Sequence, residues 1–241
     1  HRKEFEATVL SCEEKLTANG EKTGWRIVLD RTAFFPEGGG QFGDVGVLDD
    51  VEVFDTHEKG GVIYHETKEP LKPGRTVKGK LDFAVRFDRM QQHSGEHILS
   101  GLVHNLYGYD NVGFHLGTEI TTLDFNGALT EEQVQDLELR ANRAVFENVP
   151  VQVLYPAKEQ LKSVEYRSKI EIEGQVRIVS IPGYDICACC APHVARSGEI
   201  GLLKIVSCEK HRGGCRMTIL CGSRALADYQ KKQQSVTEVS V

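Results

Sequence analysis

Two pairs of metal-binding residue types, far apart in the sequence, constrain most strongly how this chain can fold. His93 and His97 are four residues apart in HSGEH, and an apolar run follows them. Residues at this spacing project from one face of a helix, one turn apart. Cys189 and His193 repeat the spacing in ICACCAPH. Two such pairs complete a tetrahedral zinc shell, so we expect the fold to bring all four side chains to one ion.

Cysteine usage agrees with a metal site. The chain has seven cysteines, an odd number, and four of them fall between Cys187 and Cys208. Disulfide frameworks spread and pair their cysteines, whereas clustering beside a histidine is typical of metal binding in a reducing cytosol. We therefore expect a cytoplasmic protein that binds Zn²⁺. The alternative is that Cys187 to Cys190 are small buried core residues, as free cysteines often are.

The first part of the chain has the pattern of strands and turns. Its segments alternate apolar and polar residues or are rich in β-branched residues, and turns with Gly or Pro separate them. These segments are residues 4–14, 24–35, 45–58, 60–69 and 75–87. Several short strands at this spacing predict a small barrel or sandwich, which we assign to a domain of residues 1–88.

After Asp88 the pattern mixes helices with strands, which predicts a two-layer α+β domain over residues 89–222. A helix of some 15 residues is expected from Asp88 to Gly108, and a second follows Thr130, where Gln133 completes a capping box. A third helix is expected over residues 223–241. Strands are predicted at 112–119, 120–127, 149–156, 176–183, 200–207 and 215–222, and a short helix or turn at 158–166.

The histidine pair alone is compatible with a different enzyme. HSGEH fits H-x-x-E-H, the inverted zinc-peptidase motif, in which Glu96 would act as the base. That hypothesis requires a third, usually acidic, ligand and gives Cys189 and His193 no role. It also leaves the Gly-rich stretch near residue 40 unexplained. Outside such a mechanism, we expect Glu96 to be a solvent-facing helix residue.

Three motifs together resemble one known family. Residues 189–207, CCAPHVARSGEIGLLKIVS, resemble the signature C-x-x-x-H-V-x-x-[T/S]-G-E-I-G of the alanyl-tRNA synthetase editing domain. Alanyl-tRNA editing proteins of the AlaX type share this signature. HSGEH takes the place of the family's H-x-x-x-H. Residues 35–46, FPEGGGQFGDVG, match F-P-x-G-G-G-Q-x-G-D-x-G of the larger members.

The resemblance implies a translation-factor-like β-barrel domain followed by a zinc-containing α+β editing domain. By position, His93, His97, Cys189 and His193 correspond to the zinc ligands. The chain starts at His1, and in the longer family members a further domain follows the C-terminal helix. We therefore expect a piece of a longer protein, and the resemblance allows a homodimer formed through the missing region. One departure is Ala191-Pro192 in place of Gly-Thr, since proline removes a backbone N–H.

The implied substrate is the tRNA for alanine charged wrongly with serine or glycine. A pocket sized for alanine cannot exclude glycine and rejects an added hydroxyl poorly, so a second site must hydrolyse the product. The aminoacyl ester is labile, and the enzyme mainly positions it and delivers water. If four ligands fill the zinc shell, the ion positions the substrate; if one is loose, the ion activates water and Glu96 acts as the base.

Other residues are candidates for contacts with the substrate. Ser94 and Gln41 are candidates to bind the serine hydroxyl, although a surface serine and a turn glutamine are the simpler interpretation. The glycines Gly38, Gly39 and Gly40 allow a tight turn with positive φ that either contacts tRNA or is a plain hairpin. No G-K-[S/T] follows them, so they do not form a P-loop.

Charge is distributed unevenly along the chain. The formal net charge is −6, but residues 196–232 contain eight Lys and Arg against three acidic residues. Within this segment Lys210, Arg212 and Arg216 are candidates for phosphate contacts with tRNA, and a solvated face is the alternative. No apolar run approaches the roughly 18 residues of a membrane span. Nothing resembles an aminoacylation domain, so we expect no ATP use. A tRNA-binding module with structural zinc and no turnover remains a third hypothesis.

Overall fold

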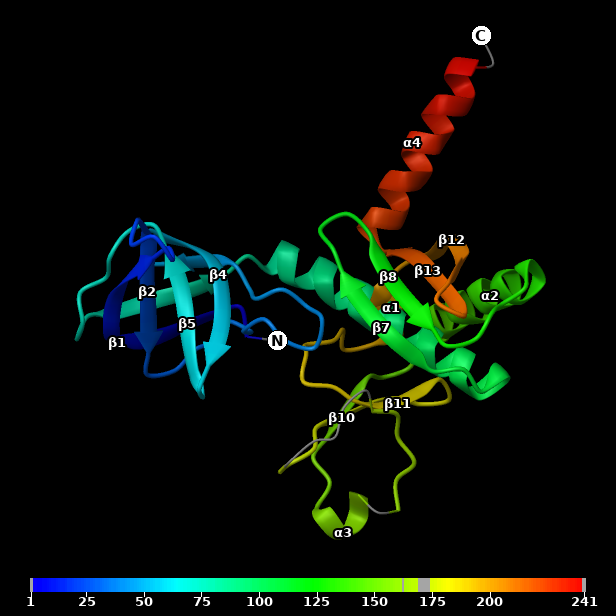
Figure 1. Ribbon diagram of the computed structural model, residues 1–241, viewed down its shortest axis with the longest axis horizontal. Helices are drawn as coiled ribbons and strands as arrows, with labels where there is room; N and C mark the ends of the chain where they lie inside the picture. Colours follow the sequence, from blue (N-terminus) through cyan, green and yellow to red (C-terminus); the bar gives the residue numbers. More distant parts are fainter. Residues whose placement is uncertain (1, 162, 169–173, 240–241) are drawn as a thin grey trace. The chain divides into compact units, whose positions relative to one another are not determined.

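Figure 1 shows a computed structural model that describes residues 2–161, 163–168 and 174–239. The chain divides into two compact units, residues 1–87 and 88–241. We call them the barrel unit and the mixed unit. Lys162, within the segment predicted at 158–166, and the last two residues of the predicted C-terminal helix lie outside the described residues.

The barrel unit is a closed antiparallel barrel of six strands in the order β1-β2-β5-β4-β3-β6. The sequence predicted a barrel or a sandwich, and the barrel is confirmed. Successive side chains of a strand point to opposite faces, and in β6 every second residue is buried. The strands are β1 (Glu4–Leu16), β2 (Lys22–Leu29), β3 (Gly46–Leu48), β4 (Val51–Lys59), β5 (Val62–Thr67) and β6 (Thr76–Leu81).

The Gly-rich stretch forms a tight turn inside the barrel unit. Gly38 and Gln41 pair through two backbone hydrogen bonds of 3.0 and 3.1 Å, and Gly39 and Gly40 between them have φ of 61° and 79°. These are left-handed conformations that glycine adopts without strain, as we predicted for Gly39 and Gly40, whereas Gly38 does not have a positive φ. Gly43 follows, and a Cβ there would lie 1.8 Å from the carbonyl oxygen of Thr56. Close backbone packing therefore requires glycine at this position.

Helix α1 (Phe83–Tyr107) begins five residues before the predicted start and has 25 residues rather than 15 or so. The prediction was wrong because LDFAVRF alternates in the manner of a strand. Asp82 decides the local structure, since its Oδ1 accepts the backbone N–H groups of Ala84 and Val85 at 3.1 Å. A side chain that satisfies the free N–H groups of the first turn is a helix start signal.

The mixed unit has a four-stranded sheet in the order β12-β13-β8-β7 and a three-stranded sheet in the order β11-β10-β9. The elements are β7 (Asn111–Leu116), β8 (Thr121–Phe125), α2 (Glu131–Glu147), β9 (Gln152–Leu154), α3 (Lys158–Leu161), β10 (Ile178–Ile181), β11 (Asp185–Ala188), a 3₁₀ turn (Ser197–Ile200), β12 (Leu203–His211), β13 (Gly214–Cys221) and α4 (Ser223–Val239). This arrangement confirms the mixed α+β class. The capping box of α2, with Thr130 and Gln133, is also present as predicted.

Helix α1 lies between elements of both sheets (Figure 1). A Cβ on Gly95 would lie 2.4 Å from the sulfur of Cys221 at the end of β13. A Cβ on Gly101 would lie 2.2 Å from the carbonyl oxygen of Tyr184, just before β11. The two glycines therefore allow the helix to approach strands on both sides. Among the described helices, none combines the length and hydropathy that a bilayer crossing requires.

The buried histidine of the barrel unit predicts a pH-dependent stability. Burial lowers the pKa of His65 to about 4, and its ring contacts Thr32 Oγ1 at 2.8 Å and the Ile27 carbonyl at 3.1 Å. The unfolded state therefore binds a proton that the folded state excludes. The contribution of His65 to the free energy of unfolding is fully present above pH 6.5. This contribution falls by about 3 kcal/mol as the pH drops toward 4.

Urea unfolding followed by the fluorescence of Trp25, the chain's one tryptophan, measures this dependence. Trp25 packs against the barrel core, so its emission reports on this unit. His65→Gln is expected to flatten the curve between pH 6.5 and 4, whereas the exposed His104→Gln control keeps the full slope. An unchanged slope in His65→Gln would contradict this assignment.

Candidate metal centre

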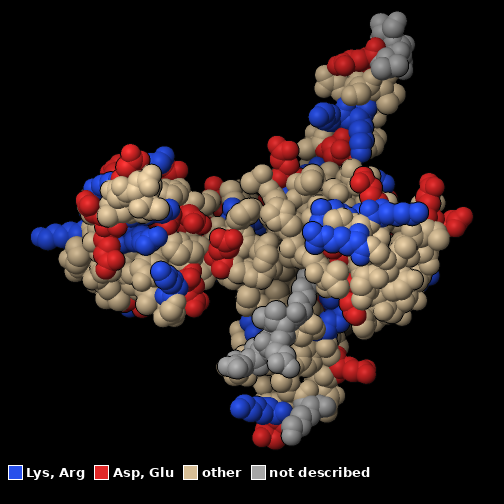
Figure 2. All heavy atoms as spheres, viewed as in Figure 1, with Lys and Arg blue, Asp and Glu red and all other residues tan. Residues whose placement is uncertain are grey.

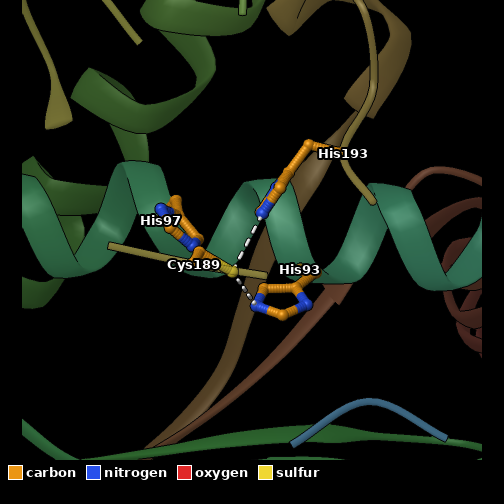
Figure 3. Close-up of side chains that lie close together, drawn as sticks. All are labelled: His93, His97, Cys189 and His193. Atoms are coloured by element: carbon orange, nitrogen blue, oxygen red, sulfur yellow. Dashed lines mark hydrogen bonds between the residues drawn. The ribbon is translucent and has the colours of Figure 1, made fainter. Parts of the chain in front are cut away.

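The structure brings together the four side chains that the two spacings singled out. His93 and His97 project from one face of α1, and Cys189 and His193 come from the loop after β11 (Figure 3). One donor atom from each lies within 4.8 Å of the other three. Cys189 Sγ is 3.6 Å from His93 Nε2 and 3.4 Å from His193 Nε2. Ligands bonded tetrahedrally to zinc lie about 3.4 Å apart, so these atoms fit around one zinc ion.

The protonation states of Cys189 and His193 suit a metal. Burial lowers the pKa of His97, but hydrogen bonds with Asp185 and Cys189 outweigh burial and raise that pKa well above its ordinary value. Burial raises the pKa of the Cys189 thiol, but hydrogen bonds from His193, His93 and His97 outweigh it and hold the pKa at about 2. Burial also lowers the pKa of His193 to about 3. A thiolate and a neutral imidazole are the forms that bind metals. The three imidazoles are almost fully buried, whereas Cys189 is partly exposed and marks the side open to solvent.

The stretch around Cys187 differs from the prediction in one respect. No strand was predicted between residues 183 and 200, but Asp185–Ala188 is strand β11, which pairs antiparallel with β10. The chain leaves the sheet only at Cys189. The two strands form a hairpin around residues 182–184, and the buried strand β10 pairs with a Cys-rich segment whose composition does not indicate a strand. Cys187 is buried and Cys190 is exposed.

Ser94 is buried rather than at the surface. Its Oγ lies 3.1 Å from His193 Nδ1 and accepts the backbone N–H of Val194 at 3.2 Å. With a metal bound at His193 Nε2, the ring proton would be on Nδ1 and would be donated to Ser94. Ser94 thus orients a ligand side chain and its neighbouring backbone.

Glu96 is buried as well, and the expectation of a solvent-facing residue was wrong. One carboxylate oxygen, Oε1, accepts hydrogen bonds of 2.7 Å from Ser100 and from Asn111. The other, Oε2, lies 3.8 Å from His97 Nε2. Ser100 is one helical turn away and Asn111 starts β7, so the carboxylate is held by a network that helix periodicity alone does not show. Glu96 lies beside the four-residue group without belonging to it.

The remaining predicted residues divide into two groups. Gln41 and the three glycines lie in the hairpin turn of the barrel unit, where Gln41 is buried. Lys210 and Arg212 are exposed at the tip of the β12–β13 hairpin. Figure 2 shows Lys and Arg side chains over the region where Figure 1 draws β8 and β13.

Not all charges of the basic segment are available to an anionic partner. Arg216 makes two 2.7 Å hydrogen bonds to Asp124, so it is already neutralised on the surface. Lys204 pairs with Glu138 at 2.8 Å. The prediction that Arg216 contacts phosphate is therefore weakened, because its partner lies on the neighbouring strand β8, distant in sequence.

Another cluster of metal-binding residue types has a different explanation. Asp55, His57 and Glu66 lie close together in the barrel unit. Lys15 and Arg26 already pair with Glu66. An ion-pair network therefore accounts for this cluster.

Comparisons with known proteins agree with the motifs. The family described as tRNA synthetases class II (A) matches residues 2–85, and the Threonyl and Alanyl tRNA synthetase second additional domain matches residues 176–216, which include Cys189 and His193. The alanyl-tRNA editing protein Aarsd1 of Mus musculus is 32% identical over 98% of this chain. AlaX-L of Pyrococcus horikoshii is 35% identical over 86% of it. The chain is related to the alanyl-tRNA editing proteins.

The predicted resemblance is thereby confirmed. The alanine–tRNA ligase of Pyrococcus furiosus is also similar, at 32% identity over 99% of this chain. The chain spans 60% of the mouse editing protein, 54% of AlaX-L and 27% of the ligase.

The geometry predicts one zinc ion for each chain. Cys189→Ala is expected to reduce bound zinc strongly, because it removes the anionic ligand and leaves three neutral imidazoles. Elemental analysis of the purified protein gives the stoichiometry. Cys190→Ala is the matched control and keeps the metal, since this exposed thiol is not part of the group. If Cys189→Ala contained as much zinc as the wild type, Cys189 would not be a zinc ligand.

Proposed function

We propose that this chain is a zinc-dependent editing hydrolase that removes serine or glycine from the tRNA for alanine. The observation that carries the proposal is the convergence of His93, His97, Cys189 and His193 in a chain related to alanyl-tRNA editing proteins. The need for such an enzyme follows from size. A synthetic site for alanine admits glycine and discriminates only weakly against the added hydroxyl of serine.

When bound, zinc supplies a fixed positive charge that orients the aminoacyl end of the substrate. Four protein ligands fill a tetrahedral shell, which favours positioning over activation of a metal-bound water. The partly exposed Cys189 leaves one side open. On β7, the half-buried ring of Phe114 lies 4.8 Å from the His93 ring and forms a wall of the site.

Glu96 is the group we propose for proton transfer. Its Oε2 lies next to the ligand group, while Ser100 and Asn111 hold Oε1. A water that adds to the ester carbonyl gives a proton to Oε2 of Glu96. The bond between the carbonyl carbon and the ribose oxygen then breaks, and the ribose oxygen leaves with the proton returned by Oε2. The products are the free amino acid and the tRNA. A general base of this kind contributes about 10²–10⁴-fold.

The zinc-peptidase hypothesis loses its support. It assigned no role to Cys189 and His193, yet both lie against the histidine pair. The hypothesis of a tRNA-binding module without turnover assigns the same four zinc ligands. A hydrolysis assay is needed to distinguish it from the hydrolase.

The decisive experiment offers the purified protein tRNA for alanine charged with serine, glycine or alanine and follows ester loss. Loss of serine or glycine with alanine spared is the expected result. Glu96→Gln is expected to slow the reaction by about 10²–10⁴-fold without loss of zinc. The exposed Glu209→Gln serves as the matched control and keeps the rate. Binding without ester loss would refute the hydrolase and leave the non-catalytic module.

We further propose that Lys210 and Arg212 contact the tRNA backbone. Each phosphate contact releases counterions, so the logarithm of the binding constant falls linearly with the logarithm of the salt concentration. The double substitution Lys210→Gln with Arg212→Gln is expected to reduce this slope by about one to two. Lys204→Gln is the control with a smaller effect, because Glu138 already neutralises that charge. Equal slopes in the wild type and the double variant would exclude the hairpin from binding.

A further inference from the structure

We infer that Asp185 and Arg167 are positioning residues that hold His97 in the ring orientation and tautomer required for metal binding. This inference rests on the metal centre of the proposed function. It concerns two residues that no spacing rule singled out.

The contacts form a short chain from the ligand outward. His97 Nδ1 lies 2.8 Å from Asp185 Oδ2. Arg167 donates two hydrogen bonds to the same carboxylate, from Nε to Oδ1 at 2.8 Å and from Nη2 to Oδ2 at 3.0 Å. The carboxylate is 1% exposed and the guanidinium 12% exposed. A paired, two-pronged contact of this kind fixes both groups in one plane.

The backbone explains why these groups meet. Asp185 opens β11, and Cys189 follows directly after that strand ends. Arg167 is bound to β11 on its other side, because its N–H donates to the Ile186 carbonyl at 2.8 Å and its carbonyl accepts from Ala188 at 2.9 Å. Strand β11 therefore positions both Asp185, the partner of His97, and Cys189, which follows the strand directly. A shift of β11 would move both together.

The chemical consequence lies in the tautomer. A neutral imidazole has one N–H, and the other nitrogen carries the lone pair that binds a metal. A carboxylate at Nδ1 keeps the proton there, so Nε2, the nitrogen 3.8 Å from Glu96 Oε2, keeps its lone pair for the ion. Arg167 pairs with both oxygens of the same carboxylate and holds it in place against His97 Nδ1. Loss of such a partner typically costs 10- to 100-fold in metal affinity.

The contacts of the ligands differ in strength. Nδ1 of His193 lies against the neutral hydroxyl of Ser94. His97 is paired with a carboxylate that is itself paired with an arginine. Removal of the Asp185 charge is therefore expected to lower the affinity for the metal more than Ser94→Ala does.

The test measures zinc affinity by competition with a chromophoric chelator. Asp185→Asn is expected to bind zinc 10- to 100-fold more weakly than the wild type. Arg167→Lys keeps the charge but loses the two-pronged contact, so a smaller loss is expected. The matched control is Arg224→Lys, since Arg224 is also 12% exposed and also makes paired contacts with an aspartate, Asp88. It is expected to keep wild-type affinity.

A second readout separates positioning from a general structural role. Nitrogen-15 NMR of the zinc-loaded wild type should show His97 protonated at Nδ1, and Asp185→Asn should lose that protected proton signal. Thermal unfolding of the metal-free variants shows whether each one folds. Wild-type affinity in a folded Asp185→Asn would overturn the inference. If that variant does not fold, equal affinities for Arg167→Lys and Arg224→Lys would overturn it. A wild type that binds no zinc would refute the metal centre itself.

Discussion

The close approach of α1 to strands on both of its sides is the constraint on which the site depends. Gly95 lies between the two histidines and allows the close approach of the Cys221 sulfur and the Leu203 side chain, while Gly101 faces the backbone before β11. A side chain at either position would push the helix away from one sheet. Because zinc–ligand bonds are near 2 Å, a displacement of a few tenths of an ångström is felt by every ligand. The packing of α1 against the strands thus also determines the geometry of the metal ligands.

The sequence was sufficient where function depends on local spacing. The i,i+4 histidine pair, the Cys189–His193 pair, the capping box of α2 and the positive-φ glycines were all visible as patterns of a few residues. The sequence failed where the outcome depends on pairing across the fold. The burial of Glu96 and the Arg216–Asp124 pair depend on partners from other elements, Asn111 of β7 and Asp124 of β8. Strand β11 was missed although its partner β10 is the preceding strand, because its Cys-rich residues lack a clear strand pattern. The start of α1 failed for another reason, because a strand-like alternation concealed the cap at Asp82.

The missed residues share a physical role. Asn111, Asp185 and Arg167 do not belong to the four-residue group, yet they hold His97 and its neighbour Glu96 through charged hydrogen bonds. A buried carboxylate is stable only when it is paired, which is why Glu96 and Asp185 each have two partners or more. An acidic residue four positions before Cys189 was the one available signal, and it is too weak without the strand assignment.

The loop that carries Cys189 and His193 shows how a departure from the family pattern is accommodated. Pro192 has no N–H, so the chain cannot use a backbone donor at this point of the loop. Arg177 instead donates to the carbonyl oxygens of Cys189 and Ala191, within 3.0 Å of each. These two hydrogen bonds from one guanidinium stabilise the turn. Pro192 stabilises it further, because proline reduces the conformational entropy of the unfolded loop. The loop is therefore held by the side chain of Arg177, the residue directly before β10.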